Sequence, residues 1–206
     1  EGGHRVPFFL HWPVGGFSKG RDIETLAAHI DVLPTLADLC QLPKPDQRFD
    51  VDGLSLTPLL AGKAKSWNRN HLFLQYHGGA HHKFAPGPLI NSVVMTERWR
   101  LVNTASEQEL YDIQSDPSQR DNIVNQRPEI VIDLRTAYQS FWQRVSPGLK
   151  PVAIDLGDTA ENPAVLCSQD WRTETGNPPW NFRSIEGIPK VTHPWLVNIL
   201  RAGEYR

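Results

Sequence analysis

Residues 31–42 read Asp-Val-Leu-Pro-Thr-Leu-Ala-Asp-Leu-Cys-Gln-Leu and predict an amphipathic helix. Apolar side chains recur there with the i, i+1, i+4, i+7, i+8 spacing of one helix face, namely Val32, Leu33, Leu36, Leu39 and Cys40. Asp31 is the expected N-cap, and Pro34 falls in the first turn, where a missing N–H loses no hydrogen bond. Pro43 is expected to end the helix. We therefore expect a core-packing helix with Leu36 at the centre of its buried face.

The bulk composition is that of an ordinary globular chain. Of its 206 residues, 39% are hydrophobic and 21% are charged. The formal net charge of −2 gives no electrostatic footprint for nucleic acid. No run approaches the 18 apolar residues of a membrane span. Cys40 is expected to be a small buried side chain, whereas a disulfide between Cys40 and Cys167 is left open.

Short apolar runs between turn signals predict a series of strands and one long helix. The predicted strands are Val6–Trp12, which we expect to be buried, then Leu72–Tyr76, Ile90–Met95, Trp99–Val102 and Glu109–Ile113. A hairpin is expected around Thr96-Glu97-Arg98. A helix is expected to start at Pro128, with apolar side chains along one side at Ile130, Val131, Leu134, Tyr138, Phe141 and Trp142. Antiparallel strands followed by one amphipathic helix make a small α+β unit.

The composition changes at Ser146, after which Pro, Gly, Asn and Trp dominate and helical periodicity is lost. Candidate strands in this extension are Val152–Leu156, Ala164–Cys167 and Trp195–Leu200. We expect a β-leaning extension of unknown role.

An ordered set of short motifs identifies a family. The set comprises Glu1-Gly2-Gly3-His4-Arg5, the helix from Asp31, Asp52-Gly53-Leu54, Glu109-Leu110-Tyr111-Asp112, Asp116-Pro117 and Asp121-Asn122-Ile123. In this order and at these gaps, residues 1–145 resemble the C-terminal part of an arylsulfatase-type sulfatase of the alkaline-phosphatase-like superfamily. The resemblance implies a fold that passes from α/β to α+β. Residues 1–66 would end the sulfatase α/β domain, 67–145 would form an antiparallel sheet with a packed helix, and 146–206 would be the extension.

The same resemblance implies that the catalytic chemistry lies outside this chain. In the family the nucleophile is a formylglycine made from Cys or Ser in a Cys/Ser-x-Pro-x-Arg motif, and calcium is held by Asp and Asn groups of N-terminal segments. Neither cysteine of this sequence stands in that motif, and no Asp-Asp or Asp-His pair replaces the calcium ligands. We therefore expect an inactive fragment with no catalytic and no metal residues of its own. Its partner would be the N-terminal catalytic part of the same protein, where calcium and formylglycine are expected; the compartment is left open.

Four histidines, at positions 71, 77, 81 and 82, lie within twelve residues. Zinc binding is an alternative, but neighbouring His81 and His82 rarely face one metal, and no Cys, Asp or Glu lies between Leu72 and Thr96. Glycines and prolines make this stretch a loop. The resemblance places the loop at the substrate rim, so His77, His81, His82 and Lys83 are the candidate substrate-binding residues, for a sulfated small molecule or carbohydrate.

Two other functions stay open on the sequence alone. A phosphodiesterase or phosphonate hydrolase of the same superfamily would differ in its nucleophile. A non-catalytic carbohydrate-binding or interaction module would use Trp residues such as Trp171, Trp180 and Trp195 to stack on sugar rings, although such residues more often serve packing.

Overall fold

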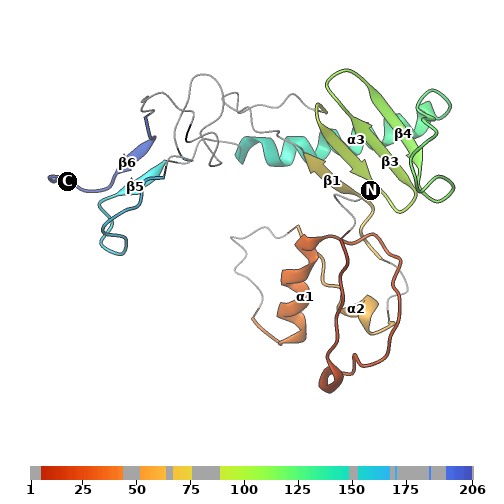
Figure 1. The fold of residues 1–206 in the computed structure, drawn as a ribbon, viewed down its shortest axis with the longest axis horizontal. Coiled ribbons are helices and arrows are strands. Elements are labelled where there is room, and N and C mark those ends of the chain that lie inside the picture. The colour runs from red at the N-terminus through yellow and green to blue at the C-terminus, as the bar shows by residue number, and fades with distance from the viewer. Residues whose placement is uncertain are drawn as a thin grey trace. The chain divides into compact units, whose positions relative to one another are not determined.

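The computed structural model describes residues 6–43, 52–63, 67–75, 89–148, 153–167, 170, 186 and 194–205 (Figure 1). The chain divides into two compact units, one made of residues 1–74 and 92–137 and the other of residues 75–91 and 138–206. Within each unit the elements can be followed from the sequence. The division of the chain at residue 66 stays a prediction.

Two short 3₁₀ turns and two helices lie in the described residues of the first part of the chain. The turns are η1 (Pro13–Gly15) and η2 (His29–Asp31), and the helices are α1 (Val32–Leu39) and α2 (Thr57–Leu60). The predicted helix is therefore confirmed, with Pro34 in its first turn, although it ends earlier than expected.

Gln41, rather than Pro43, marks the end of α1. Its backbone lies in the left-handed region at φ 54°, and its N–H donates to the Asp38 carbonyl at 3.1 Å. The Leu42 N–H donates to the Ala37 carbonyl at 2.8 Å. This pair of bonds is a Schellman motif, which satisfies the last carbonyls of a helix before any proline is reached.

Asp31 is fully buried and joins three separate segments of the chain. One carboxylate oxygen of Asp31 accepts the Ala28 N–H at 2.9 Å, and the other accepts the Leu54 N–H at 2.8 Å. The second oxygen also accepts a hydrogen bond from Arg69, and the two side chains form a buried ion pair. Asp31 does stand at the N-cap position of α1, but its side chain makes no capping bond to that helix. The expected cap is wrong in this respect because the carboxylate binds more distant donors.

Thr35, one turn after Asp31, extends the same polar cluster. Its buried hydroxyl donates to the Asp31 carbonyl at 2.5 Å and accepts the Leu56 N–H at 2.8 Å. Gly53 lies beside this contact, where a Cβ would overlap the Ile30 carbonyl. Only glycine therefore allows the 53–56 segment to approach the start of α1 so closely.

The apolar side of α1 is not buried in this chain. Leu33 is 65% exposed, Leu36 is 47% exposed, and Cys40 is also exposed. The expected burial of this face and of the Cys40 thiol is therefore wrong. Helix α1 is held instead through the side that presents Asp31 and Thr35.

The predicted buried strand Val6–Trp12 is likewise wrong. Residues 6–11 form no strand, and Phe9 is 91% exposed. Trp12 pairs only with Phe17, by one isolated bridge around η1, with the two rings stacked 6.2 Å apart.

The predicted antiparallel sheet is confirmed. It contains β1 (Leu72–Gln75), β2 (Ser92–Met95), β3 (Trp99–Asn103) and β4 (Gln108–Asp112), in that spatial order. The register aligns Val94, Leu101 and Leu110 in one row across three strands, and all three side chains are fully buried. Directly opposed residues share a face, so this row is the centre of the hydrophobic core.

The motifs Asp116-Pro117 and Asp121-Asn122-Ile123 lie in the loop that covers the outer edge of β4. Asn122 accepts the Leu110 N–H at 3.1 Å, and Ile123 donates its N–H to the Leu110 carbonyl at 2.9 Å. The carboxylate of Asp116 accepts the N–H groups of Arg120 and Asp121 and so shapes the preceding turn. The loop thereby pairs backbone groups that an edge strand would otherwise leave open.

The long helix is confirmed as α3 (Pro128–Val145). Its apolar side chains behave as the spacing predicts, since Val131, Leu134 and Tyr138 are buried. Glu129 in the first turn and Arg144 in the last suit the helix dipole.

The extension holds a small parallel pair of strands. Strand β5 (Ile154–Leu156) pairs with β6 (Val197–Ile199), which confirms two of the three candidate strands. Ala164–Cys167 forms no strand, and that candidate is wrong. Cys40 and Cys167 are both free and exposed in this structure.

Replacing Asp31 by Asn should destabilise the first part of the chain strongly. The change leaves the Arg69 guanidinium buried without its counter-charge, a loss that typically costs about 3–5 kcal/mol. The measurement is the free energy of urea unfolding. Asp38→Asn, at an exposed position of the same helix, is the matched control and should change this free energy by less than about 0.5 kcal/mol. Equal effects of the two substitutions would contradict the assignment.

Candidate functional site

The four candidate substrate-binding residues, His77, His81, His82 and Lys83, lie outside the described residues. The structure does describe both ends of that segment. Gln75 ends β1, and its amide Nε2 donates to the Ile90 carbonyl at 2.7 Å. Gln75 Oε1 accepts a hydrogen bond from the hydroxyl of Tyr138. One amide side chain therefore ties the two ends of the 76–88 segment together and to α3.

The return into β2 uses unusual backbone geometry. Leu89 has φ 80° and Asn91 has φ 53°, both in the left-handed region. Asn tolerates this region, but for Leu it is a strained conformation. Such strain is found where the surrounding structure fixes a loop, often next to functional sites. Sequence reasoning missed Gln75 and Tyr138 because neither belongs to a catalytic motif.

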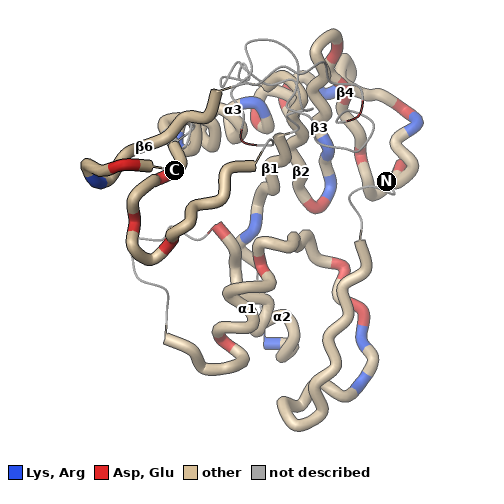
Figure 2. The backbone as a smooth tube through the Cα atoms, turned by 60° about the vertical axis from the view of Figure 1, so that its left-hand side comes forward, with Lys and Arg blue, Asp and Glu red and all other residues tan. Residues whose placement is uncertain are grey.

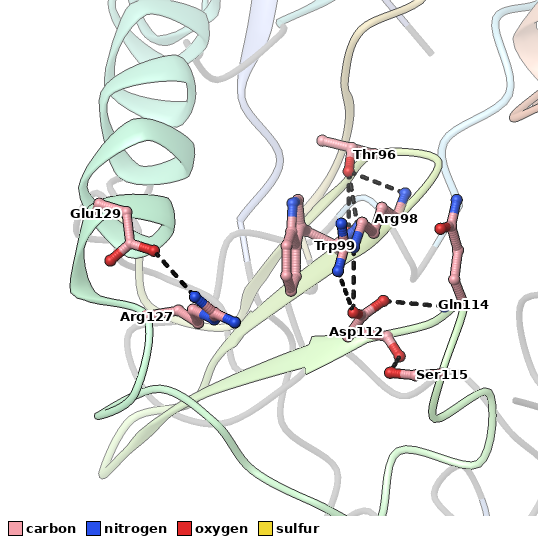
Figure 3. A network of polar contacts seen from close by, with 8 residues as sticks. All are labelled: Thr96, Arg98, Trp99, Asp112, Gln114, Ser115, Arg127 and Glu129. Atoms are coloured by element: carbon pink, nitrogen blue, oxygen red, sulfur yellow. Dashed lines mark hydrogen bonds and ion pairs between the residues drawn. The ribbon is translucent and has the colours of Figure 1, made fainter.

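The tip of the β2–β3 hairpin carries a second polar network (Figure 3). The Arg98 guanidinium donates two hydrogen bonds to one carboxylate oxygen of Asp112, from Nε at 3.1 Å and from Nη2 at 2.8 Å. The other Asp112 oxygen accepts the Gln114 N–H at 3.2 Å. Thr96 accepts the Arg98 and Trp99 N–H groups with its hydroxyl, which closes the turn.

This network neutralises its own charges. Arg98 also lies over the ring of Trp99, with its Cζ 4.5 Å from the ring centroid, a cation–π contact. The Arg98 guanidinium keeps the pKa of Asp112 below its usual value, chiefly through the hydrogen bond. Asp112 in turn raises the pKa of Arg98. The pair therefore braces the hairpin rather than offering a free cation to a sulfate group.

The calcium that the family resemblance implies finds no ligand set in the described part of this chain. No three His, Cys, Asp or Glu side chains come together there. The buried carboxylate of Asp31 already accepts hydrogen bonds from Ala28, Leu54 and Arg69. A Ca²⁺ site needs six to eight oxygen ligands around one point, so these residues do not fit the ion.

Among the described residues, charged and aromatic side chains give no second candidate site. Positions of Lys and Arg alternate with positions of Asp and Glu along the described backbone (Figure 2). None of the described helices has the length and hydrophobicity that a membrane span requires. Trp171 and Trp180 lie outside the described residues, and Trp195 donates its indole N–H to the Cys167 carbonyl at 2.9 Å.

Comparison with known proteins gives a consistent match. Residues 1–141 match the family described as N-sulphoglucosamine sulphohydrolase, C-terminal. The arylsulfatase of Clostridium perfringens is 29% identical over 128 residues, which cover 61% of this chain and 24% of that protein. The human steryl-sulfatase is 40% identical over 73 residues, which cover 35% of this chain and 12% of that protein.

A solved structure of a 2-O GAG sulfatase is also similar, with 22% identity and a TM-score of 0.48 over 63% of this chain and 28% of that chain. In sequence, the chain spans 24% of the length of the Clostridium perfringens arylsulfatase and 12% of the length of the human steryl-sulfatase.

Replacing Asp112 by Asn should destabilise the fold in a pH-dependent way. The lowered pKa means that the native state holds the carboxylate charged more readily than the unfolded state does. That stabilisation is present above the ordinary Asp pKa of about 4 and is lost as pH falls through the lower native pKa. The urea midpoint of the variant should therefore lie below that of the parent sequence at pH 7 and approach it towards pH 3.

Glu129→Gln is the control for this experiment. Glu129 pairs with Arg127 at 4.0 Å, and both side chains are more than half exposed, so little change is expected at any pH. A difference between Asp112→Asn and the parent sequence that stays constant from pH 7 to pH 3 would refute the assigned role of this ion pair.

Proposed function

Because this chain belongs to the N-sulphoglucosamine sulphohydrolase C-terminal family, we propose that it works within a sulfatase that hydrolyses sulfate monoesters. The observation that supports a structural role for this chain is that residues of its family motifs make contacts within the fold. Asp31, Gly53 and Asn122 all serve backbone approach and hydrogen bonding within the fold. These three residues therefore have structural roles. The chain would contribute structure, and the reacting groups would come from the catalytic part of the parent protein.

The catalytic part would supply the formylglycine nucleophile and the calcium ion. There the formylglycine would serve as the nucleophile towards the sulfate group, and the cation would supply Lewis-acid stabilisation of its negative charge. The present chain would act by holding a sheet and its loops beside that part. Its natural substrate would be a sulfated small molecule or carbohydrate.

Within this function, the 76–88 segment would form part of the substrate rim. Its two ends are tied by Gln75, and its return is fixed by the left-handed backbone of Leu89 and Asn91. A segment with anchored ends places its side chains with less loss of entropy than a free loop. Imidazoles at His77, His81 and His82 could donate hydrogen bonds to hydroxyl or sulfate oxygens, and Lys83 adds a cation.

The 206-residue chain alone should not hydrolyse an aryl sulfate. Its sequence lacks the nucleophile motif, and its described residues assemble no calcium site. The measurement is release of nitrophenol from nitrophenyl sulfate by the purified chain, with a mock purification as the background. Reproducible turnover above that background would overturn the proposal. The same assay on the full-length parent, with an aryl phosphonate monoester alongside, distinguishes a sulfatase from a phosphonate hydrolase.

In the full-length parent, His77→Ala should lower kcat/KM for the natural substrate by about 10-fold or more and spare a small aryl sulfate. A rim group contacts the distal part of a large substrate and not the reacting sulfur. His29→Ala, which removes an exposed imidazole from the first part of the chain, is the matched control. Equal losses on both substrates would indicate a folding defect, and an unchanged natural-substrate rate would remove His77 from the rim.

A further inference from the structure

The amide of Gln75 has one orientation that satisfies both of its partners. Its Nε2 donates to the Ile90 carbonyl at 2.7 Å, and its Oε1 accepts a hydrogen bond from the Tyr138 hydroxyl. A carbonyl oxygen only accepts hydrogen bonds, so Ile90 requires the amide nitrogen on its side. The amide oxygen then faces Tyr138, and the Tyr138 hydroxyl must be the donor. The three groups therefore form a directed chain of hydrogen bonds that starts at Tyr138 and ends at Ile90.

Tyr138 is the fixed end of this chain. Its side chain is fully buried, and its ring stacks on Trp142 with the centroids 6.4 Å apart and the planes 11° apart. A second ring, that of Phe141, lies with its centroid 5.9 Å away. These neighbours hold the phenol ring in place, as close packing does in a protein interior. Gln75 is a long, half-buried side chain at the end of β1, so it is ordered only through the partners that it binds.

The other end of the chain is strained backbone. Leu89, with φ 80°, and Asn91, with φ 53°, stand on either side of Ile90. Leucine disfavours the left-handed region, so the conformation persists only where surrounding contacts stabilise it. The hydrogen bond from Gln75 to the Ile90 carbonyl is one such contact, placed between the two strained residues. Loss of the Tyr138 hydroxyl would free the Gln75 amide and remove that support.

We propose that the Tyr138 hydroxyl is a positioning group for the substrate rim, which orients Gln75 and through it the turn Leu89–Asn91, and so makes the parent enzyme selective for large sulfated substrates. This inference rests on the proposed function and adds to it the group that holds the rim in place. Tyr138 is fully buried, so it acts through Gln75 and not by contact with a substrate. Its effect is therefore expected in the KM of a substrate that reaches the rim, and not in kcat.

Tyr138→Phe in the full-length parent tests the positioning without any substrate. The change removes the hydroxyl and retains the packed ring. Trypsin cleavage after Lys83, the one Lys or Arg in residues 70–97, measures how firmly the segment between Gln75 and Ile90 is anchored. Cleavage should be about 2- to 10-fold faster than in the parent sequence, because the loss of one ordinary hydrogen bond raises the population of the open form by about that factor.

Two further variants make this result specific. Gln75→Glu keeps the size of the side chain but sets an oxygen against the Ile90 carbonyl, so it should accelerate cleavage to a similar degree. The double variant with Tyr138→Phe should be no faster than either single variant, because both changes break the same chain of hydrogen bonds. Tyr111→Phe removes the hydroxyl of another buried tyrosine, in β4, and is the matched control that should leave cleavage after Lys83 unchanged.

Selectivity is measured as kcat and KM for nitrophenyl sulfate and for sulfated disaccharides prepared from chondroitin sulfate and heparin. For a disaccharide that the parent hydrolyses, Tyr138→Phe should raise KM by about 2- to 10-fold and leave kcat within about 2-fold. Tyr111→Phe should change neither value. The ratio of kcat/KM values should therefore shift towards nitrophenyl sulfate in the first variant alone.

The outcomes separate this inference from the proposed function. Unchanged cleavage after Lys83 in Tyr138→Phe, or equal acceleration in Tyr111→Phe, would overturn the positioning role. Faster cleavage with an unchanged KM for the disaccharide would overturn the link to substrate selectivity. A parent that hydrolyses none of these sulfate esters would remove the proposed function, and cleavage after Lys83 would still decide whether Tyr138 holds the turn.

Discussion

The buried ion pair between Asp31 and Arg69 is the interaction on which the first part of the chain depends. Its carboxylate also accepts N–H groups from Ala28 and Leu54, so one side chain joins the turn before α1, a segment 23 residues later and Arg69. A buried carboxylate is costly unless each oxygen is paired, and here both oxygens accept hydrogen bonds. With few apolar side chains buried nearby, this polar cluster sets the local geometry.

The sequence predicted the sheet and the long helix well because their constraints are local and internal. Short apolar runs predicted the strands, in which the observed register buries Val94, Leu101 and Leu110, and a 3.6-residue period predicted the apolar side of α3, where Val131 and Leu134 are buried. Both patterns are satisfied by neighbours within the same chain. The structure therefore agrees with the prediction where the sequence supplies both partners of a contact.

The candidate site was predictable only in part. A run of histidines between glycines indicates a loop, but it does not reveal what holds the loop's ends. Gln75 and Tyr138 meet from positions 63 residues apart, and no sequence pattern pairs an isolated Gln with an isolated Tyr. The Arg98–Asp112 pair was missed for a similar reason, because the β3–β4 register, rather than residue spacing, brings it together.

The errors over Val6–Trp12 and the apolar side of α1 share one physical cause. Hydrophobic periodicity predicts which side of a segment is buried, but it does not identify the residues that bury it. Leu33, Leu36 and Phe9 are exposed here while their pattern predicts burial. The hydrogen bonds of Asp31 and Thr35, by contrast, are made to residues of this chain. The described part of this chain therefore fixes its own backbone with internal hydrogen bonds while the apolar side of α1 stays exposed.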